Sequence, residues 1–399
     1  MAITRRHMMG GTAAALPMLA GTATLPDRNG FGPIGAYLDA AFTHPLGAFA
    51  VEAGRSYLKS RFDAPQAVGP RGNPRRAAVE RFARLVNVDP HDIAVVPSTL
   101  DGENLVNLSL GTGPGAGVVT DGLHYDGSLA LYGELARRGA PVRVARPRGG
   151  GVDLADLRAL IGPDTRLIAV SLVSSTTGFR HDLAELCSIA HARGVLVYAD
   201  IIQAAGAVPL DLRASGVDFA CCGTYKWLMG DFGTAFLYVR PDRLDRLKRV
   251  ETGWRQVRQQ YSHVLPFETP GPALGEYELA GDAAGLFEVS TPAWGALAVV
   301  AASLDHILGI GVDAVARHRR PLVDRLQAVL PGLGFLPLTP PGSASPIVAF
   351  AIRNADKRFD AALEASRINV STYPNRIRIS PSLYNDADHI ERLIEVLRR

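Results

Sequence analysis

The chain has 399 residues and a formal net charge of +3, and 47% of its residues are hydrophobic and 20% charged. This length allows a large and a small domain with a sizeable core, whereas the small charge, without a concentrated basic stripe, argues against nucleic acid as a partner. Beyond the N-terminus no stretch of 18 or more uncharged apolar residues occurs, so we expect no stable membrane insertion.

The N-terminal region differs in composition from the rest of the chain. Arg5 and Arg6 precede Gly10–Thr24, which is uncharged and rich in Ala, Gly and Leu, with small residues from Ala20 to Ala23. A charged segment, an apolar segment and a small-residue cleavage site are typical of an export signal, and paired arginines favour the twin-arginine route. We therefore expect a periplasmic or secreted protein, with a plain tail on a cytoplasmic protein as the alternative.

A helix with a polar start is expected within Pro97–Asn107, where small and polar residues precede an apolar helical pattern. The N-terminus of a helix presents free N–H groups and a positive dipole end, which suit a phosphate. Gly102 and Glu103 are our candidates for this contact through their backbone amides. The acidic side chains of Asp101 and Glu103 would repel a phosphate, so at least one should point away. A capped helix without a ligand is the alternative.

Strand-like and helical stretches alternate through the middle of the chain. The apolar strand-like runs cover 142–145, 167–173, 195–200 and 219–222, and helical patterns cover 154–161 and 183–193. This alternation predicts an α/β fold in which helices cover a mostly parallel sheet. We expect a tail over 1–29, a large domain over 30–289 whose first residues are free to pack on the small domain, and a small domain over 290–399.

A carboxylate and a lysine stand at the ends of two of these apolar runs. Asp200 ends the run 195–200, and ligands bind beyond the carboxyl ends of strands in open α/β sheets. A buried carboxylate needs a cationic partner. The protonated nitrogen of a bound pyridine ring would provide one, and Gln203 is placed to donate to a phenolic oxygen on that ring. The alternative for Asp200 is an ordinary helix N-cap.

Lys226 lies between the apolar runs Phe219–Cys222 and Ala235–Val239. Burial lowers the pKa of a lysine toward the neutral amine that forms a Schiff base. Pyridoxal 5'-phosphate (PLP) requires such an amine, a carboxylate for its pyridine nitrogen and a cradle for its phosphate. Lys226, Asp200 and the polar helix start therefore predict a PLP site.

Four motifs resemble those of the class V aminotransferase family of fold-type I PLP-dependent enzymes, and they occur in that family's order. They are Tyr37-Leu-Asp-Ala-Ala41, Asp200-Ile-Ile-Gln203, Tyr225-Lys226-Trp227 and Arg378-Ile-Ser-Pro-Ser-Leu-Tyr-Asn385. The resemblance runs from about Tyr37 to the C-terminus. It implies the fold-type I transferase fold, with a large domain around a mostly parallel sheet and a smaller C-terminal α/β domain, PLP on Lys226, and a homodimer.

The resemblance also implies roles around the cofactor. His124 lies where the family places an aromatic ring that stacks on the cofactor, with Tyr125 as the alternative. Ser175 stands where many relatives carry an asparagine near the phenolic oxygen. Thr224 and Tyr225 directly precede the lysine and are further cofactor-binding candidates.

Two more parts of the chain gain an expected role from the resemblance. Ser290 and Thr291 resemble a turn that reaches the phosphate of the neighbouring subunit. Arg378 is expected to bind the substrate carboxylate, because a guanidinium matches a carboxylate with two hydrogen bonds, and Arg376 is placed to share or take that role. The Pro/Gly-rich stretch 265–275 predicts a long loop near the substrate entrance.

The expected function is chemistry at the Cα of an amino acid or of a compound containing one, with transamination as the first choice. Epimerisation, β-elimination and oxidative decarboxylation share the first carbanion and stay open, as does a non-catalytic binding protein with this fold. We do not expect a cysteine desulfurase. Relatives with that activity carry a nucleophilic cysteine on a loop shortly before the C-terminal arginine motif, and the corresponding stretch 367–375 has none. Cys187, Cys221 and Cys222 fall in elements expected to be buried. Neither a metal site nor a disulfide framework is expected.

Overall fold

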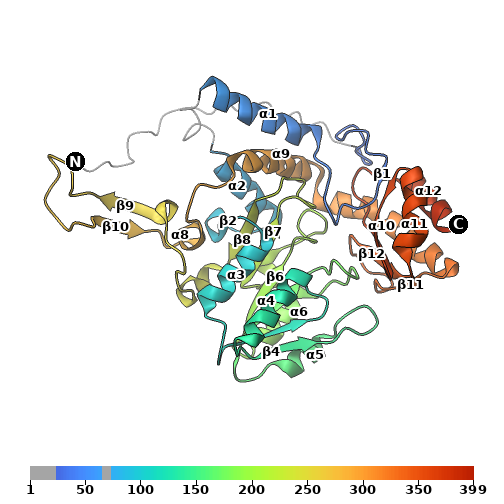
Figure 1. The fold of residues 1–399 in the computed structure, drawn as a ribbon, viewed down its shortest axis with the longest axis horizontal. Coiled ribbons are helices and arrows are strands. Elements are labelled where there is room, and N and C mark those ends of the chain that lie inside the picture. The colour runs from blue at the N-terminus through green and yellow to red at the C-terminus, as the bar shows by residue number, and fades with distance from the viewer. Residues whose placement is uncertain (1–23, 65–72) are drawn as a thin grey trace.

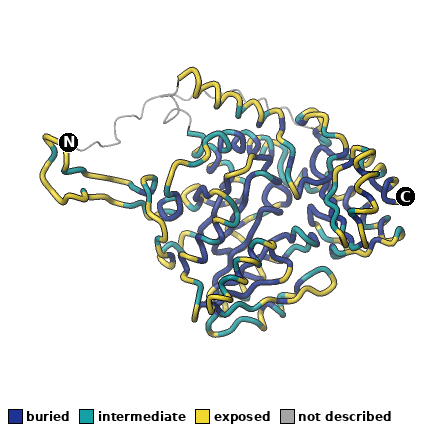
Figure 2. Tube along the Cα trace, viewed as in Figure 1, coloured by how far each residue is buried: buried dark blue, intermediate teal, exposed yellow. Residues whose placement is uncertain are grey.

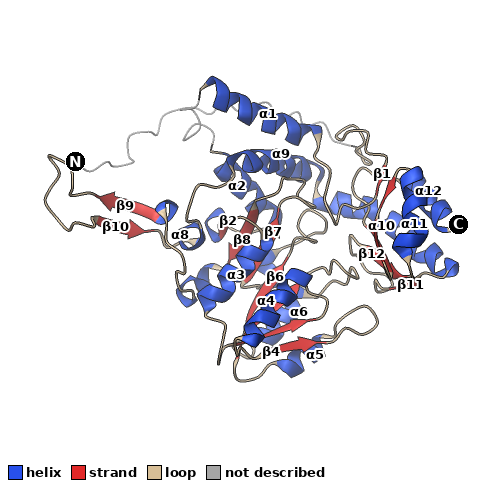
Figure 3. Ribbon diagram, viewed as in Figure 1, coloured by secondary structure: helices blue, strands red, loops and turns tan. Residues whose placement is uncertain are grey.

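The computed structural model describes residues 24–64 and 73–399 (Figure 1). Residues 1–23 of the expected export signal, including Arg5 and Arg6, lie outside the described residues. The chain forms a large central sheet covered by helices, a second and smaller sheet near the C-terminus, and a β-hairpin that projects from the body (Figure 3).

The central sheet has seven strands in the order β2-β8-β7-β6-β5-β3-β4. β8 runs antiparallel to both of its neighbours, and the other adjacent pairs are parallel. The predicted α/β fold with a mostly parallel sheet is thus confirmed. The strands are β2 (Ile93–Val96), β3 (Gly117–Asp121), β4 (Val142–Ala145), β5 (Thr165–Ser171), β6 (Leu196–Asp200), β7 (Phe219–Gly223) and β8 (Ala235–Val239).

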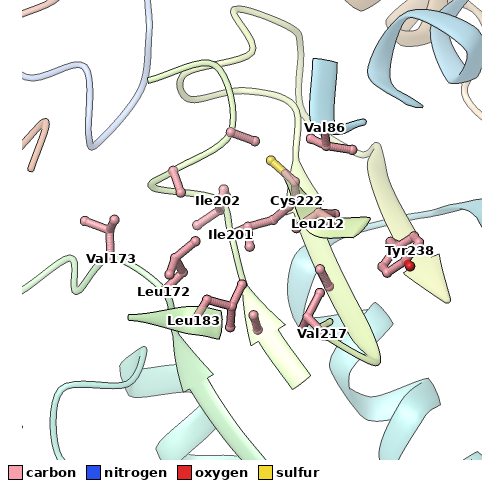
Figure 4. Packing of buried hydrophobic residues seen from close by; sticks show 14 of the residues in the cluster. Val86, Leu172, Val173, Leu183, Ile201, Ile202, Leu212, Val217, Cys222 and Tyr238 are labelled. Carbon is pink, nitrogen blue, oxygen red and sulfur yellow. The ribbon is translucent and has the colours of Figure 1, made fainter. Parts of the chain in front are cut away.

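Helices cover both faces of this sheet because its strands are apolar on both sides. One face packs against α3 (Thr99–Leu110), α4 (Asp126–Arg137) and α8 (Ala283–Phe287). The opposite face packs against α2 (Pro74–Val86), α5 (Leu154–Leu160), α6 (Leu183–His191), α7 (Leu212–Ser215) and α9 (Trp294–Ile310). Figure 4 shows part of the core on this second face, where mostly aliphatic side chains from the strands, their loops and the covering helices meet.

A second core lies near the C-terminus, around a four-stranded sheet of order β11-β12-β15-β14. β1 (Ala36–Tyr37) pairs in parallel with β13 (Ile368–Asn369), so Ala36 and Leu38 are buried in this C-terminal core. The other members are β11 (Leu336–Pro337), β12 (Val348–Ala351), β14 (Ser371–Tyr373), β15 (Arg376–Ile379), α10 (Val312–Val329), α11 (Ala355–Ala365) and α12 (Ala387–Leu397).

Helix α9, which lies between the two cores in the sequence, packs on the first core. α9 lies against α2 and against α1 (Ala48–Asp63), and Leu297, Val300 and Leu304 are part of the large core. Apart from Ala36 and Leu38, the second core therefore takes its residues from α10 onward. No single helix in the described ranges is long and apolar enough to cross a membrane, and only α9 taken with 312–333, a pair bent by 76°, meets those criteria together.

The projecting hairpin consists of β9 (Val257–Tyr261) and β10 (Glu276–Leu279). Its residues are largely exposed, in contrast to the buried central strands (Figure 2). The Pro/Gly-rich stretch 265–275 lies within the connection between these two strands. A place for this loop at the substrate entrance stays a prediction.

Candidate active site

Polar side chains gather beyond the carboxyl ends of β3, β5, β6 and β7. Ser171 and Asp200 are the last residues of adjacent parallel strands, and their Cα atoms are register partners. Asp200 also pairs in register with Cys221 of β7, two residues before that strand ends, so the loop carrying Lys226 starts beside it. This edge of a mostly parallel sheet is where ligands bind in open α/β folds.

Asp200 is a buried carboxylate, 4% exposed, with unused acceptor capacity. The backbone N–H of Ile202 donates to its Oδ1 at 2.9 Å, and the hydroxyl of Ser171 reaches its Oδ2 only at 3.5 Å. Burial raises the pKa of Asp200, while the Ile202 amide and His124 act in the opposite direction. A cationic N–H donor at Oδ2 would satisfy this carboxylate, as a protonated pyridine nitrogen does.

Lys226 is also buried, with 9% of its surface exposed. Burial lowers the pKa of its ammonium to about 8; Asp200 opposes this shift, and Arg378 adds to it. The amine therefore becomes neutral at a pH where an ordinary lysine is still charged. Its environment is that of a lysine that forms a covalent bond to a carbonyl cofactor.

Gln203 connects the Asp200 loop to the lysine loop. Its Oε1 accepts a hydrogen bond from the indole N–H of Trp227 at 2.8 Å, and its Nε2 donates to the carbonyl of Ala41 at 2.9 Å. An amide nitrogen carries two protons, so one remains for a phenolic oxygen. That role stays a prediction. The contact with Trp227, which directly follows Lys226, holds the Gln203 side chain beside the lysine loop.

The start of α3 lies against the end of β7. Ser98 caps the helix by accepting from the amide of Asp101 at 3.1 Å, and the amide of Gly102 donates to the Ser98 carbonyl at 3.1 Å. By helix geometry the amides of Thr99 and Leu100 have no acceptor inside the helix. These two earlier amides are better placed for a phosphate than that of Gly102, whose predicted role stays untested.

Gly102 has a packing reason of its own. A Cβ at this position would lie 2.6 Å from Sγ of Cys221 and 3.3 Å from its Cβ, well inside normal contact. The absence of a side chain lets the first turn of α3 approach β7. The amide of Gly223 then donates to Oγ1 of Thr99 at 2.9 Å, which joins the helix start to the strand end.

Glu103 turns its carboxylate inward to His124, with both side chains completely buried. Oε1 lies 3.0 Å from Nε2 of His124, and the hydroxyls of Tyr132 and Ser128 donate to Oε1 and Oε2 at 2.5 and 2.6 Å. The other ring nitrogen of His124, Nδ1, lies 2.9 Å from Oγ of Ser171. The acid thus serves the histidine in this structure, and its amide contact with a phosphate stays a prediction.

Arg378 on β15 is 4% exposed and reaches toward the same edge from the C-terminal core. Its Nη2 donates to Asp39 at 3.2 Å and to Ser371 at 2.8 Å, and its Nη1 donates to the carbonyl of Ser175 at 3.2 Å. Its Nε is buried and finds no acceptor among residues 24–64 and 73–399. Burial raises the pKa of Asp39, with Arg378 and Ser371 opposing that shift.

Comparison with known proteins identifies the family. A sequence profile described as Aminotransferase class-V matches residues 37–393. The chain belongs to the class V aminotransferase family. Members of this family depend on PLP, and Lys226, the carboxylate of Asp200 with its spare acceptor capacity and the open amides at the start of α3 fit that cofactor.

Individual relatives of the class V family carry several different names. A probable cysteine desulfurase of Methanothermobacter thermautotrophicus is 28% identical over 328 residues, which cover 80% of this chain and 78% of the relative. Isopenicillin N epimerase of Streptomyces clavuligerus is 30% identical over 339 residues, covering 80% and 83%. The names therefore differ in reaction while the family is the same.

Solved structures show the same fold. The cysteine desulfurase CsdA of Escherichia coli superposes with a TM-score of 0.78 at 21% identity, over 93% of this chain and 96% of the other. The protein C-DES, with glycine covalently linked to its PLP cofactor, superposes with a TM-score of 0.81 at 23% identity, over 94% and 99%. The predicted fold-type I architecture is confirmed by these likenesses.

The remaining class V positions have the following surroundings. The hydroxyl of Thr224 donates within its own loop, to the carbonyls of Asp231 and, at 3.2 Å, Thr234. Tyr225 stacks on Phe232 with ring centroids 4.7 Å apart, and Ser175 contributes its carbonyl to Arg378. The cofactor contacts expected for Thr224, Tyr225 and Ser175 stay predictions.

Arg376, Ser290 and Thr291 are more exposed than Arg378. Arg376 donates to the carbonyl of Thr176 at 3.4 Å and stacks on Tyr373, and its share in carboxylate binding is untested. Ser290 and Thr291 are exposed, as residues that reach a second subunit would be in a single chain.

Residue-by-residue reasoning missed two members of the site, Asp39 and Ser171. Asp39 lies inside the motif 37–41, where only the strand was considered, and it pairs with an arginine 339 positions away. Ser171 ends an apolar run just as Asp200 does, so its position at a strand end was the available signal. Among the described residues, no group of three or more His, Cys, Asp or Glu side chains is arranged to hold a metal ion.

Proposed function

We propose that this PLP-dependent enzyme acts at the Cα of an α-amino acid, or of a compound that carries one, with transamination as its overall reaction. The observation that carries the proposal is the convergence of Lys226, Asp200 and Arg378 on one buried edge, where Asp200 and Arg378 both influence the pKa of Lys226. A neutral amine, an anion and a guanidinium with an open donor are the groups that this chemistry requires.

Each side chain has a separate task in the proposal. Arg378 binds the substrate carboxylate through its guanidinium N–H groups, including the unpartnered Nε, while Asp39 accepts from Nη2 and holds the group in place. Lys226, with its pKa near 8, takes and returns the proton at Cα. Asp200 stays ionised against the pyridine nitrogen, and PLP when bound supplies the electron sink for charge at Cα.

The cysteines argue against desulfurase activity despite the names of some relatives. Cys187, Cys221 and Cys222 are the protein's three cysteines, and all are buried. Burial raises the pKa of the Cys187 thiol to about 12 and raises those of the Cys221 and Cys222 thiols well above the usual range. An inert, inaccessible thiol cannot attack a substrate sulfur. Sulfide or alanine release from cysteine that depended on any of the three would contradict this reasoning.

Epimerisation is the second candidate, because a relative 30% identical over 80% of the chain is named isopenicillin N epimerase. Product analysis against a panel of amino acids, with and without a keto-acid acceptor, separates the two reactions. Transamination consumes the acceptor and forms a new amino acid, whereas epimerisation inverts Cα without an acceptor. Lys226→Ala is the control, and a parent protein that binds PLP but turns over no amine would be a non-catalytic binding protein.

Two variants test the assigned roles. Arg378→Lys should raise KM for amino acids strongly, since an ammonium cannot form the two-pronged contact with a carboxylate. Asp200→Ala should retain some PLP binding and lose most activity, because the pyridine nitrogen then lacks its anion. An unchanged KM in the first variant, or parental turnover in the second, would move the role to another residue.

We further propose that the enzyme is an exported homodimer in which Ser290 and Thr291 complete the phosphate site of the neighbouring subunit. Sedimentation equilibrium should give twice the chain mass. A reporter fused to residues 1–30 should reach the periplasm, and replacing Arg5 and Arg6 together with Lys should hold it in the cytoplasm. A cytoplasmic reporter with both arginines intact would refute export and leave the dimer to its own measurement.

A further inference from the structure

The buried carboxylate of Glu103 is contacted by three polar side chains. Three groups converge on it, from α4 and from the loop after β3: the hydroxyls of Tyr132 and Ser128 and the Nε2 of His124. Although burial alone raises the pKa of Glu103, the charge of His124 and these hydrogen bonds bring it below the usual range. Each oxygen of Glu103 accepts a hydrogen bond from a hydroxyl, which favours the carboxylate form, and a carboxylate only accepts hydrogen bonds. Nε2 of His124 must carry a proton to make this contact.

The opposite nitrogen of His124 can be assigned by counting the bonds of Ser171. A hydroxyl has one proton and two lone pairs. The amide of Tyr125 donates to Oγ of Ser171 at 3.2 Å, and Oδ2 of Asp200 is an acceptor for the hydroxyl proton at 3.5 Å. With that proton on the Asp200 side, the remaining lone pair of Ser171 faces Nδ1 of His124 at 2.9 Å, and Nδ1 is the donor in this arrangement. Both ring nitrogens then carry protons.

We propose that Glu103 holds His124 as an imidazolium cation, so that a positively charged ring lies beside Asp200 at the cofactor site. This inference rests on the position proposed for His124 next to the cofactor ring. In this arrangement Glu103 is a positioning residue, which acts on the cofactor through the histidine.

The charges around His124 agree with the assignment. Three carboxylates influence it from three elements: Glu103 on α3, Asp121 at the end of β3 and Asp200 at the end of β6. Burial lowers the pKa of His124, but the charge of Glu103, its hydrogen bond and the two aspartates raise it overall. Tyr132, which stacks on the His124 ring, and Tyr198, which lies within the influence of Glu103 and Asp200, are neutral, since burial raises the pKa of each phenol well above its ordinary value.

The consequence is a chain of alternating charge that ends at the cofactor. Glu103 is negative, His124 positive and Asp200 negative, with Ser171 between the last two. The imidazolium favours the ionised form of Asp200, which burial opposes. An acid placed on the far side of the histidine thus helps to keep the anion that holds the pyridine nitrogen protonated.

The decisive measurement is the protonation of the His124 ring by nitrogen-15 NMR of histidine-labelled protein, assigned with His124→Asn. It is carried out on the PLP-free chain and repeated with PLP. We expect both nitrogens to be protonated at pH 8, well above the ordinary histidine pKa of about 6.5. In Glu103→Gln the protonated fraction at this pH should fall at least tenfold. A neutral ring in the parent, with Ser171 donating to Nδ1, overturns the proposal, and so does an unchanged ring in the variant.

Matched variants separate charge from architecture. Ser128→Ala and Tyr132→Phe each remove one hydrogen bond to Glu103 and keep its charge, so His124 should stay protonated in both. If all three variants lose stability alike and none changes the ring, the network is only structural and the proposal fails. If Glu103→Gln does not fold, the parental ring still decides. With PLP present, the pH profile of the cofactor absorption band should shift in Glu103→Gln and not in the controls.

The outcomes for Glu103 and for the proposed enzyme function are distinguishable. A chain that never binds PLP would refute the function, while the measurement on the PLP-free protein would still test His124. A doubly protonated ring in a protein without turnover would support the Glu103 assignment alone.

Discussion

Lys226 should react as a neutral amine at a pH where an ordinary lysine is still charged. Its pKa of about 8 compares with an ordinary value of 10.5. At pH 8 about half of Lys226 is therefore neutral, against about 0.3% of an ordinary lysine. The reactive form is enriched roughly 150-fold, a difference large enough to measure directly.

The assay follows the attachment of PLP to the apoprotein, trapped with borohydride and mapped by peptide mass, between pH 6 and pH 10. Labelling of Lys226 should rise with a midpoint near 8, and the exposed Lys59 and Lys357 serve as internal references mapped in the same digest. Asp200→Asn should lower the Lys226 midpoint further, because the carboxylate favours the charged ammonium. A Lys226 midpoint near 10, or an upward shift in Asp200→Asn, would refute the reasoning.

The same shift predicts a pH dependence of stability. The folded pKa of Lys226 lies below the unfolded one, so the unfolded chain binds the extra proton in the window between them. The apoprotein should therefore gain stability as pH rises from about 8 to about 10.5, by up to about 3 kcal/mol relative to Lys226→Met. Urea titrations of both proteins at several pH values provide the measurement.

Two stability predictions concern the elements that hold the site. Gly102→Ala should lower the free energy of unfolding in urea by about 1–3 kcal/mol, because the new Cβ meets Sγ of Cys221 at 2.6 Å. Adding Cys221→Ala should recover most of this loss. Equal losses in the single and double variants would contradict the prediction. Glu288→Gln should cost about 3 kcal/mol, since this buried acid accepts three hydrogen bonds from Arg75, whose side chain is 17% exposed. Arg76→Ala, which removes an exposed ion pair, should change stability by less than about 1 kcal/mol and is the control.

The central sheet could be predicted from the sequence because its strands are buried on both faces. Continuous apolar runs ending at Asp200 and Cys222 have no other stable environment, and the structure places strands there, within about one residue of the expected ends. The hairpin β9–β10 gave no such signal. Val257–Tyr261 is Val-Arg-Gln-Gln-Tyr and mostly exposed, so its strand form comes from pairing with β10. Propensity and periodicity do not reveal that kind of strand.

The candidate site also contains residues that the sequence predicts and contacts that it does not predict. Lys226 and Asp200 stand at the ends of apolar runs, so their burial follows from their neighbours in the sequence. The contacts of Glu103 with His124 and of Arg378 with Asp39 join residues 21 and 339 positions apart. They depend on how α3 meets the loop after β3 and on how β15 faces the N-terminal segment. Like charges repel, so the sequence predicts only that an acid beside a phosphate turns away. Packing then decides which partner Glu103 finds.

The pairing of β1 with β13 has a consequence for synthesis on the ribosome. About 330 residues separate Ala36 from Ile368, its register partner. At roughly 5–20 residues per second, Ala36 waits roughly 15 to 70 seconds before that partner is made. During this time Ala36 and Leu38, buried in the finished protein, have no core to enter. A chain that stops before Ile368 should therefore be cut by protease near residue 36, while its central sheet resists.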